Sequence, residues 1–264
     1  MKGPIYDSSF YAAYIQDSIG SANAVLAVVR DIVNPKSVVD VGCGLGTWLK
    51  VWRDFGVEDI KGIDGSYVQR DELLIPRDQF TAMDLSAPTM LTSKFDLVQS
   101  LEVAEHLPER SADNFISFLC SLGPVVLFSA AIPFQGGTNH INEQWPEYWA
   151  RLFLKHGFLP FDAIRDQVWD DPIVTFYYAQ NALLFVQTDH VKVLESLSMR
   201  PAVPHKVLSR VHPTQWTEKN QECLPFGQLI KMLPRSSWNF ALRAFRKMRK
   251  VSGLSRNASL VVLG

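Results

Sequence analysis

The chain has 264 residues, 47% of them hydrophobic and 20% charged, a composition that excludes a disordered chain, a collagen or a coiled coil and fits one large α/β domain with an appendage. The net charge of −1 is unevenly spread, because residues 200–264 contain 12 Lys and Arg but 2 acids, which indicates a basic tail on an acidic body. Three cysteines exclude a disulfide framework, and the sequence has neither a secretion signal nor an apolar run of membrane-spanning length, so we expect a cytoplasmic protein.

Helices and strands alternate along the first 190 residues. In chain order, the apolar pattern predicts a helix over 5–33, a strand at 37–41, a helix over 47–55, strands at 60–63, 79–83 and 95–100, a helix over 111–122, a strand at 125–130, a helix over 142–156, and closing strands at 158–163 and 180–187. Several of these strands are apolar on both faces, which is typical of a parallel sheet covered by helices on both sides.

A glycine-rich turn follows the first predicted strand. Residues 40–46 have the sequence D-V-G-C-G-L-G, and glycines at such a turn let the backbone approach a ligand closely and adopt positive φ. The turn differs from the dinucleotide loop G-x-G-x-x-G, because Thr47 stands where the last glycine belongs, and it lacks the G-K-S/T of a phosphate loop. Asp40 precedes the first glycine and either holds the turn or faces a cationic cofactor.

Four motifs within residues 35–187 resemble those of the class I S-adenosylmethionine (AdoMet) methyltransferases. They are the glycine turn, Gly62-Ile63-Asp64, Ala82-Met83-Asp84-Leu85 and residues 95–107. The resemblance implies a Rossmann-like, doubly wound α/β sheet of about seven strands, mostly parallel, with a closing antiparallel hairpin. It implies that the glycine turn and Asp64 hold AdoMet, with the Asp64 carboxylate on the ribose hydroxyls, and that Asp84 lies near the adenine. The cofactor site implied in this way consists of Asp40, Gly42, Cys43, Gly44, Gly46, Asp64, Asp84, Leu85, Leu101 and Glu102.

The fourth motif, in residues 95–107, ends in E-x-x-E-H. Its spacing places Glu102, Glu105 and His106 on one helical turn, and His140 follows the neighbouring strand of the implied sheet. Two carboxylates and two imidazoles suit Mg²⁺, Mn²⁺ or Zn²⁺. The motif resembles that of small-RNA 3′-terminal 2′-O-methyltransferases and of ubiquinone-pathway O-methyltransferases, which implies a metal that lowers the pKa of the acceptor hydroxyl.

The metal-free alternative is that Glu105 and His106 only close the turn between strand and helix, with His140 as a general base. In either case the catalytic candidates are His140, Glu105 and His106.

The acceptor side is predicted in residues 136–149 and 177–181, where aromatic and amide side chains alternate. The candidate substrate residues are Asn139, Trp145, Tyr148, Tyr178 and Asn181. The phrase N-H-I-N-E-Q-W-P-x-Y-W, followed by Y-x-Q-N, resembles methyltransferases associated with bacterial surface polysaccharides, which implies O-methylation of a sugar or glycan hydroxyl. The alternatives are a nucleic-acid ribose, a small phenolic or quinone-like metabolite, and, in another class, a non-catalytic AdoMet-fold binding subunit.

The tail, residues 191–264, is punctuated by prolines and carries a predicted basic amphipathic helix near residues 236–250. Such a helix is typical of segments that lie on anionic membranes, so we expect association with the cytoplasmic face of a membrane. Docking of the helix on the acidic domain, residues 1–190, is the alternative. Nucleic acid is not an expected partner, because the basic face would have to extend over that acidic domain.

Overall fold

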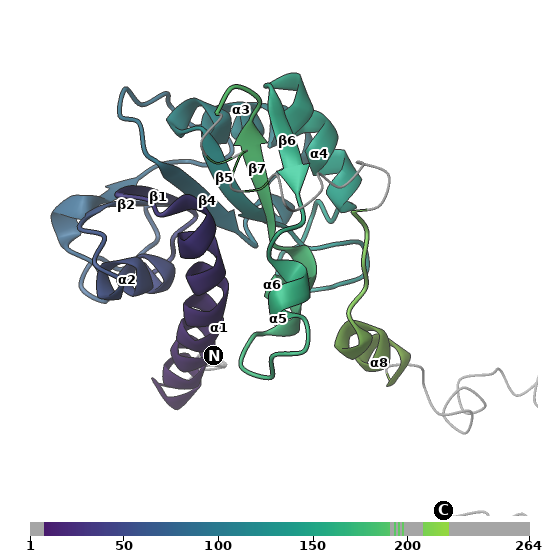
Figure 1. The fold of residues 1–264 in the computed structure, drawn as a ribbon. Helices are drawn as coiled ribbons and strands as arrows, with labels where there is room; N and C mark the ends of the chain where they lie inside the picture. Colours follow the sequence, from purple (N-terminus) through teal and green to yellow (C-terminus); the bar gives the residue numbers. More distant parts are fainter. Residues whose placement is uncertain (1–7, 191–192, 194, 196, 198–207, 222–264) are drawn as a thin grey trace, which may run out of the picture. The chain divides into compact units, whose positions relative to one another are not determined.

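The computed structural model describes residues 8–190, 193, 195, 197 and 208–221 (Figure 1). The predicted amphipathic helix at 236–250, most of the predicted tail and the first residues of the predicted helix over 5–33 lie outside the described residues. None of the helices in the described part is long and apolar enough to span a bilayer.

One seven-stranded sheet forms the centre of the structure, in the order β3-β2-β1-β4-β5-β7-β6. Its parallel strands are β1 (Ser37–Val41), β2 (Asp59–Asp64), β3 (Phe80–Ala82), β4 (Leu97–Leu101) and β5 (Val125–Ser129). The hairpin of β6 (Phe158–Phe161) and β7 (Leu183–Gln187) closes the sheet, with β7 antiparallel to β5. The predicted fold class is therefore confirmed.

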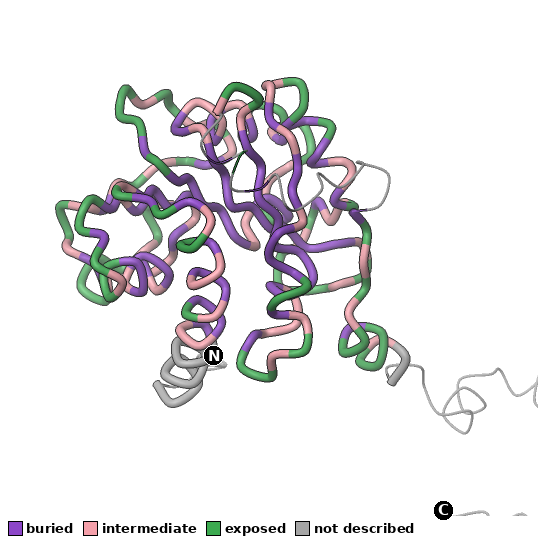
Figure 2. Tube along the Cα trace, viewed as in Figure 1, coloured by how far each residue is buried: buried purple, intermediate pink, exposed green. Residues whose placement is uncertain are grey.

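Helices cover both faces of this sheet (Figure 1). Residues of α1 (Ser8–Val33), α2 (Thr47–Asp54), α5 (Arg165–Val168) and α6 (Phe176–Asn181) share one apolar cluster, and α3 (Ala112–Leu122) and α4 (Pro146–Lys155) share the other. Neighbouring strand residues point to opposite clusters, as Val38 and Val39 do, because side chains alternate along a strand. Both strand faces are therefore buried (Figure 2).

Shorter elements complete the described part of the chain. They are the 3₁₀ turns η1 (Arg77–Gln79), η2 (Ala104–His106) and η3 (Glu109–Ser111), and the helix α8 (Pro213–Gln221).

The sheet order places β1 beside β4, and their carboxyl ends lie at one edge. The chain leaves β1 toward β2 and returns to the other side at β4, which makes this edge the topological switch point where open α/β sheets bind ligands. The glycine turn and the E-x-x-E-H motif follow these two strands, so the fold brings them together.

Within the described residues, two predicted elements begin three or more residues later in the structure. The helix expected over residues 142–156 begins at Pro146, because proline is favoured in the first turn of a helix, where its missing N–H is not needed. Residues 180 and 181, expected in the last strand, end α6. The side-chain amides of both residues are buried and hydrogen-bond to other polar side chains.

The chain divides into two units, Met1–Trp216 and Thr217–Gly264. The boundary predicted from the sequence lies at residue 190. Leu208 is fully buried, and the backbone N–H groups of Leu208 and Ser209 donate to the Glu147 carboxylate at 3.0 and 2.9 Å. Residues 208 and 209 therefore pack with the first unit, although they belong to the basic part of the sequence.

Arg165 joins the segment that begins at residue 208 to the sheet and its helices through hydrogen bonds. Its guanidinium is fully buried and donates two hydrogen bonds to Asp162, at 2.8 and 2.6 Å. Its Nη1 donates to the carbonyls of Gln180 and Leu208, at 3.1 and 2.7 Å. We expect Arg165→Met to lower the free energy of unfolding by about 3–5 kcal/mol, because it leaves the buried Asp162 carboxylate without its main partner. Urea denaturation followed by circular dichroism measures this loss.

Arg210→Met is the matched control. Arg210 also pairs with Asp162 and with Asp166, but its side chain is 37% exposed, so we expect a loss below about 1 kcal/mol. Equal losses in the two variants contradict the role given to Arg165.

Candidate active site

The glycine turn lies between β1 and α2 at the carboxyl end of β1. Its backbone is held by the Ile63 carbonyl, which accepts from the N–H groups of Gly42 and Cys43 at 2.7 and 3.3 Å. Gly42 has a φ of +88°, and a Cβ there would lie 2.2 Å from the Val103 side chain. Gly44 has a φ of +53°, and no described atom lies within 4 Å of the Cβ it lacks. The turn is therefore tightly packed on one side and open to a ligand at Gly44.

Asp64 joins the end of β2 to this turn. Its Oδ2 accepts the Gly44 N–H at 2.7 Å, and its Oδ1 accepts the Gly65 N–H at 2.6 Å. The Tyr67 hydroxyl also donates to Oδ1, although the Tyr67 side chain is 76% exposed. The carboxylate is thus buried against the turn while one oxygen faces a hydroxyl at the surface.

Asp40 is a second buried carboxylate at this edge. Burial raises its pKa to about 7, the neighbouring Gln99 side chain acts against that rise, and the Asp64 charge adds to it. A cation placed beside Asp40 would offset the cost of burying its charged form.

Asp84 and Leu85 follow β3. Asp84 is exposed at the turn, where its Oδ1 accepts from the backbone N–H and the hydroxyl of Ser86 at 2.9 and 2.7 Å, and these bonds lower its pKa. Leu85 is buried. The structure therefore gives Asp84 a turn-capping role, while its predicted place near an adenine stays a prediction.

Glu102 follows Leu101, the buried last residue of β4, and lies in a polar network. Its backbone has a φ of +55°, and its carboxylate accepts from Gln135 Nε2 at 2.8 Å and from Asn181 Nδ2 at 3.1 Å. Burial raises the pKa of Glu102, and these two amide bonds act against that rise. The predicted substrate residue Asn181 is therefore buried against Glu102.

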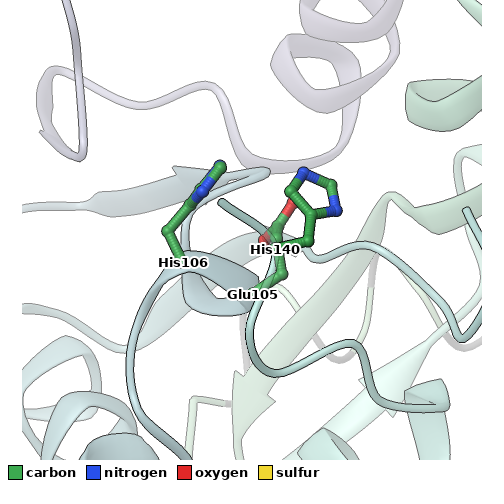
Figure 3. A group of neighbouring side chains, drawn as sticks. All are labelled: Glu105, His106 and His140. Atoms are coloured by element: carbon green, nitrogen blue, oxygen red, sulfur yellow. The ribbon is translucent and has the colours of Figure 1, made fainter. Parts of the chain in front are cut away.

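Glu105, His106 and His140 come together at the same edge (Figure 3). One possible ligand atom from each lies within 4.8 Å of the others. The 3₁₀ turn η2 supplies Glu105 and His106, and the loop between β5 and α4 supplies His140. Glu102, the fourth predicted ligand, is not part of this group because the two amides hold its carboxylate.

Hydrogen bonds determine which nitrogen of each imidazole in this group carries the proton. His106 Nδ1 lies 3.3 Å from the Asn139 carbonyl, and His140 Nδ1 lies 3.0 Å from Oε1 of Glu143. Both partners are acceptors, so each Nδ1 carries the proton when the ring is neutral. The two Nε2 atoms therefore keep their lone pairs for a ligand or a proton.

The Glu105 carboxyl group is fully buried, and neither of its oxygens has a hydrogen-bond partner among the described residues. Burial and, next, the nearby Glu102 charge raise its pKa, and burial lowers the pKa of His106. Burying an unpartnered carboxylate is costly, so this group must hold either a proton or a cation.

The other predicted substrate residues separate into two kinds. Asn139 has a φ of +60° and Trp145 is partly exposed, and both belong to the loop that carries His140. Tyr178 is buried and packs edge-on against Trp48 with ring centres 4.9 Å apart. Tyr148 lies edge-on against Trp149. Tyr178 therefore packs in the body, while Asn139 and Trp145 lie on the loop that carries His140, and the substrate role of all four residues stays a prediction.

Gln135 and Glu143 contact the predicted site residues, yet sequence analysis gave neither of them a role. Gln135 links Glu102 to Asn181, and Glu143 accepts from His140. Glu143 does stand three residues after a candidate histidine in a polar stretch, which is the one sequence signal for it.

Comparison with known proteins places the chain among methyltransferases. A family model described as a methyltransferase domain matches residues 13–167, more than half of the chain. The malonyl-[acyl-carrier protein] O-methyltransferase of Pseudescherichia vulneris is 26% identical over 164 residues, which cover 60% of this chain and 62% of that protein. The chain thus spans less than two thirds of the length of this curated relative.

Two solved structures illustrate the similarity. Magnesium protoporphyrin IX methyltransferase from Synechocystis PCC 6803 with bound SAH is 21% identical, covers 71% of this chain and 90% of its own, and gives a TM-score of 0.49. The methyltransferase domain of bacterial CtHen1 is 22% identical, covers 63% and 96%, and gives a TM-score of 0.45. Since the family match includes β1 to β5 together with the glycine turn, Asp64 and the Glu105–His106–His140 group, the chain belongs to the methyltransferase domain family.

Proposed function

We propose that the protein is an AdoMet-dependent O-methyltransferase whose acceptor is a sugar or glycan hydroxyl. The observation that carries this proposal is the adjacency of two sites at one sheet edge. The glycine turn with Asp64 follows β1 and β2, and Glu105, His106 and His140 follow β4 and β5. One site suits a methyl donor and the other suits an acceptor hydroxyl that must lose its proton.

The residues around the turn fit AdoMet. Asp64 Oδ1 already accepts a hydroxyl, from Tyr67, and a ribose hydroxyl has the same donor chemistry. The raised pKa of Asp40 favours a positively charged ligand, and the space at Gly44 lets the ligand approach the backbone. When bound, AdoMet supplies a methyl group activated by its sulfonium charge.

The chain's own residues then orient the acceptor and move its proton. When no metal is bound, His140 Nε2, left unprotonated by the bond from Nδ1 to Glu143, would accept the proton of an acceptor hydroxyl. Holding the hydroxyl in line with the methyl group supplies much of the rate, because the reaction becomes effectively unimolecular.

A divalent metal bound by Glu105, His106 and His140 is a further part of the proposal. The buried, partnerless Glu105 carboxyl and the two Nε2 atoms make a donor set that fits Zn²⁺ or Mn²⁺ better than Mg²⁺, which prefers oxygen ligands. A bound metal would lower the pKa of the acceptor hydroxyl. We propose three protein ligands, since the Glu102 carboxylate is held by Gln135 and Asn181.

The acceptor class rests on the loop that carries His140. Phe134, Ile141 and Trp145 are exposed on it, and so is Asn139. Aromatic faces with hydrogen-bonding groups between them suit a sugar ring. The curated relative is an O-methyltransferase by name, which supports oxygen as the methylated atom. A nucleic-acid ribose, a phenolic or quinone-like metabolite, and a non-catalytic binding subunit remain the competing hypotheses.

The first test concerns AdoMet. We expect Asp64→Ala to weaken AdoMet binding by about 100-fold, because each lost hydrogen bond to a charged group is worth about 1.5–3 kcal/mol. Isothermal titration calorimetry measures the affinity. Asp96→Ala is the control, since its carboxylate also accepts two backbone N–H groups, from Lys36 and Ser37, at the start of β1. Unchanged affinity in folded Asp64→Ala removes the assignment.

The second test concerns the metal. We expect calorimetry to detect Mn²⁺ binding to the wild-type protein, and His106→Ala and His140→Ala each to abolish it, because each removes one of three ligands. AdoMet affinity should be nearly unchanged after chelation, since the turn is separate from the group. His156→Ala, at the end of α4, is the control. Turnover that persists after exhaustive chelation, with no metal found by elemental analysis, rejects this part of the proposal.

The third test concerns the basic tail, for which we propose binding to an anionic membrane surface. The support is the charge of residues 200–264, since each Lys or Arg near an anionic leaflet contributes about 1 kcal/mol. The full chain should co-sediment with anionic vesicles at low salt, and binding should fall by about 100-fold in the triple variant Arg243→Glu, Arg246→Glu, Lys250→Glu. The same change at Lys36, Arg53 and Lys155 is the control. Absence of wild-type sedimentation rejects the anchor.

A further inference from the structure

The loop between β5 and α4, residues 130–145, is organised around one carboxylate. Oε2 of Glu143 accepts the Phe134 N–H at 2.8 Å. Oε1 accepts the Gly136 N–H at 2.7 Å and faces His140 Nδ1 at 3.0 Å. A single half-buried side chain therefore fixes two points of the backbone and the ring of a candidate catalytic residue.

The backbone of this loop needs such a fixed point. Phe134 and Asn139 have φ values of +69° and +60°, in the left-handed region that side chains other than glycine rarely adopt. Such conformations persist only where the surroundings determine them. Glu143 supplies part of that determination, and the Glu105 carbonyl supplies more by accepting the N–H groups of Ile141 and Asn142 at 2.9 and 3.0 Å.

We propose that Glu143 is a positioning residue that sets the protonation pattern of His140. An ionised carboxylate only accepts hydrogen bonds, so the neutral imidazole keeps its proton on Nδ1 and presents a lone pair at Nε2. This rests on the function proposed above, in which Nε2 of His140 binds a metal or takes the acceptor proton.

The other ring nitrogen of His140, Nε2, lies against Gly137 of the same loop. Gly137 has a φ of +153°, and a Cβ at that position would lie 2.2 Å from His140 Nε2. The absence of a side chain at Gly137 therefore leaves room for the His140 ring at this position. The same loop thus fixes one nitrogen of His140 through Glu143 and accommodates the ring through Gly137.

The same carboxylate chemistry occurs elsewhere in the body and provides a matched control. Glu147, in the first turn of α4, accepts three hydrogen bonds, from Leu208 N–H, Ser209 N–H and the Ser209 hydroxyl. It is not among the residues bonded to either histidine. Glu147→Gln therefore repeats the chemical change of Glu143→Gln at a comparable hydrogen-bonding carboxylate, without touching the site.

The decisive measurement is the ¹⁵N spectrum of the histidine rings in metal-free full-length protein at about pH 8, where an imidazole is neutral. We expect His140 of the wild type to be protonated on Nδ1. In Glu143→Gln we expect a mixture with the Nε2–H form, because the glutamine amide can donate to Nδ1. Glu147→Gln should resemble the wild type. A wild-type His140 protonated on Nε2, or an unchanged pattern in folded Glu143→Gln, overturns the proposal.

Calorimetry with Mn²⁺ gives an independent readout. We expect Glu143→Gln to bind Mn²⁺ about 10–100-fold more weakly than the wild type, the usual effect of losing the partner that orients a metal-binding histidine, with no change in Glu147→Gln. Equal Mn²⁺ affinity in wild type and Glu143→Gln overturns the proposal. If the wild type binds no Mn²⁺ but shows the expected ring protonation and its loss in Glu143→Gln, the metal hypothesis fails and the role of Glu143 stands. If Glu143→Gln does not fold, the wild-type spectrum alone decides.

Discussion

The gathering of four carboxylates at one edge of the sheet, three of them buried and Glu102 partly buried, is the constraint on which the site depends. A carboxylate taken out of water must be hydrogen-bonded, protonated or paired with a cation, and parallel strands bring together, at this edge, Asp40, Asp64, Glu102 and Glu105. Two of them are satisfied within the chain. Asp64 accepts two backbone N–H groups and a hydroxyl, and Glu102 accepts two side-chain amides.

The other two carboxylates, Asp40 and Glu105, differ from this pair. The pKa of Asp40 rises through burial, and the Glu105 carboxyl has no hydrogen-bond partner among the described residues. A positive charge beside either carboxylate would offset the cost of burying its charged form, which agrees with the proposed cofactor cation at Asp40 and the proposed metal ion at Glu105. The hydrogen-bonded carboxylates, Asp64 and Glu102, shape the site. Asp40 and Glu105 make a positively charged ligand favourable there. The negative charge of Glu102 also raises the pKa of Glu105, so the protonation of one carboxyl group affects the other.

Local sequence patterns predict the parts of this site that are local in the chain. The glycine turn, Asp64 at the end of β2 and the Glu105–His106 pair each follow a strand within a few residues, so their positions follow from the strand pattern. The hydrogen bonds from Gln135 and Asn181 to Glu102 cannot be predicted in this way, because Asn181 lies 79 residues away in sequence and Gln135 lies 33 residues away. For the same reason Tyr178, which looks like a pocket residue by composition, is a core residue against Trp48. Contacts set by tertiary packing leave no periodic trace in the sequence.

The end of the compact unit shows how far such non-local contacts reach. Gln180 Oε1 accepts the His212 N–H at 2.7 Å, and its Nε2 donates to Gln215 and to Asn181 at 2.8 and 3.0 Å. Asn181 in turn donates to Glu102. A continuous set of buried amides therefore connects the segment after residue 208 to the carboxylate at the end of β4. In a low-dielectric interior each of these bonds strengthens its neighbours, so the segment belongs to the framework that holds the Glu102 carboxylate, although its charge suggests a separate tail.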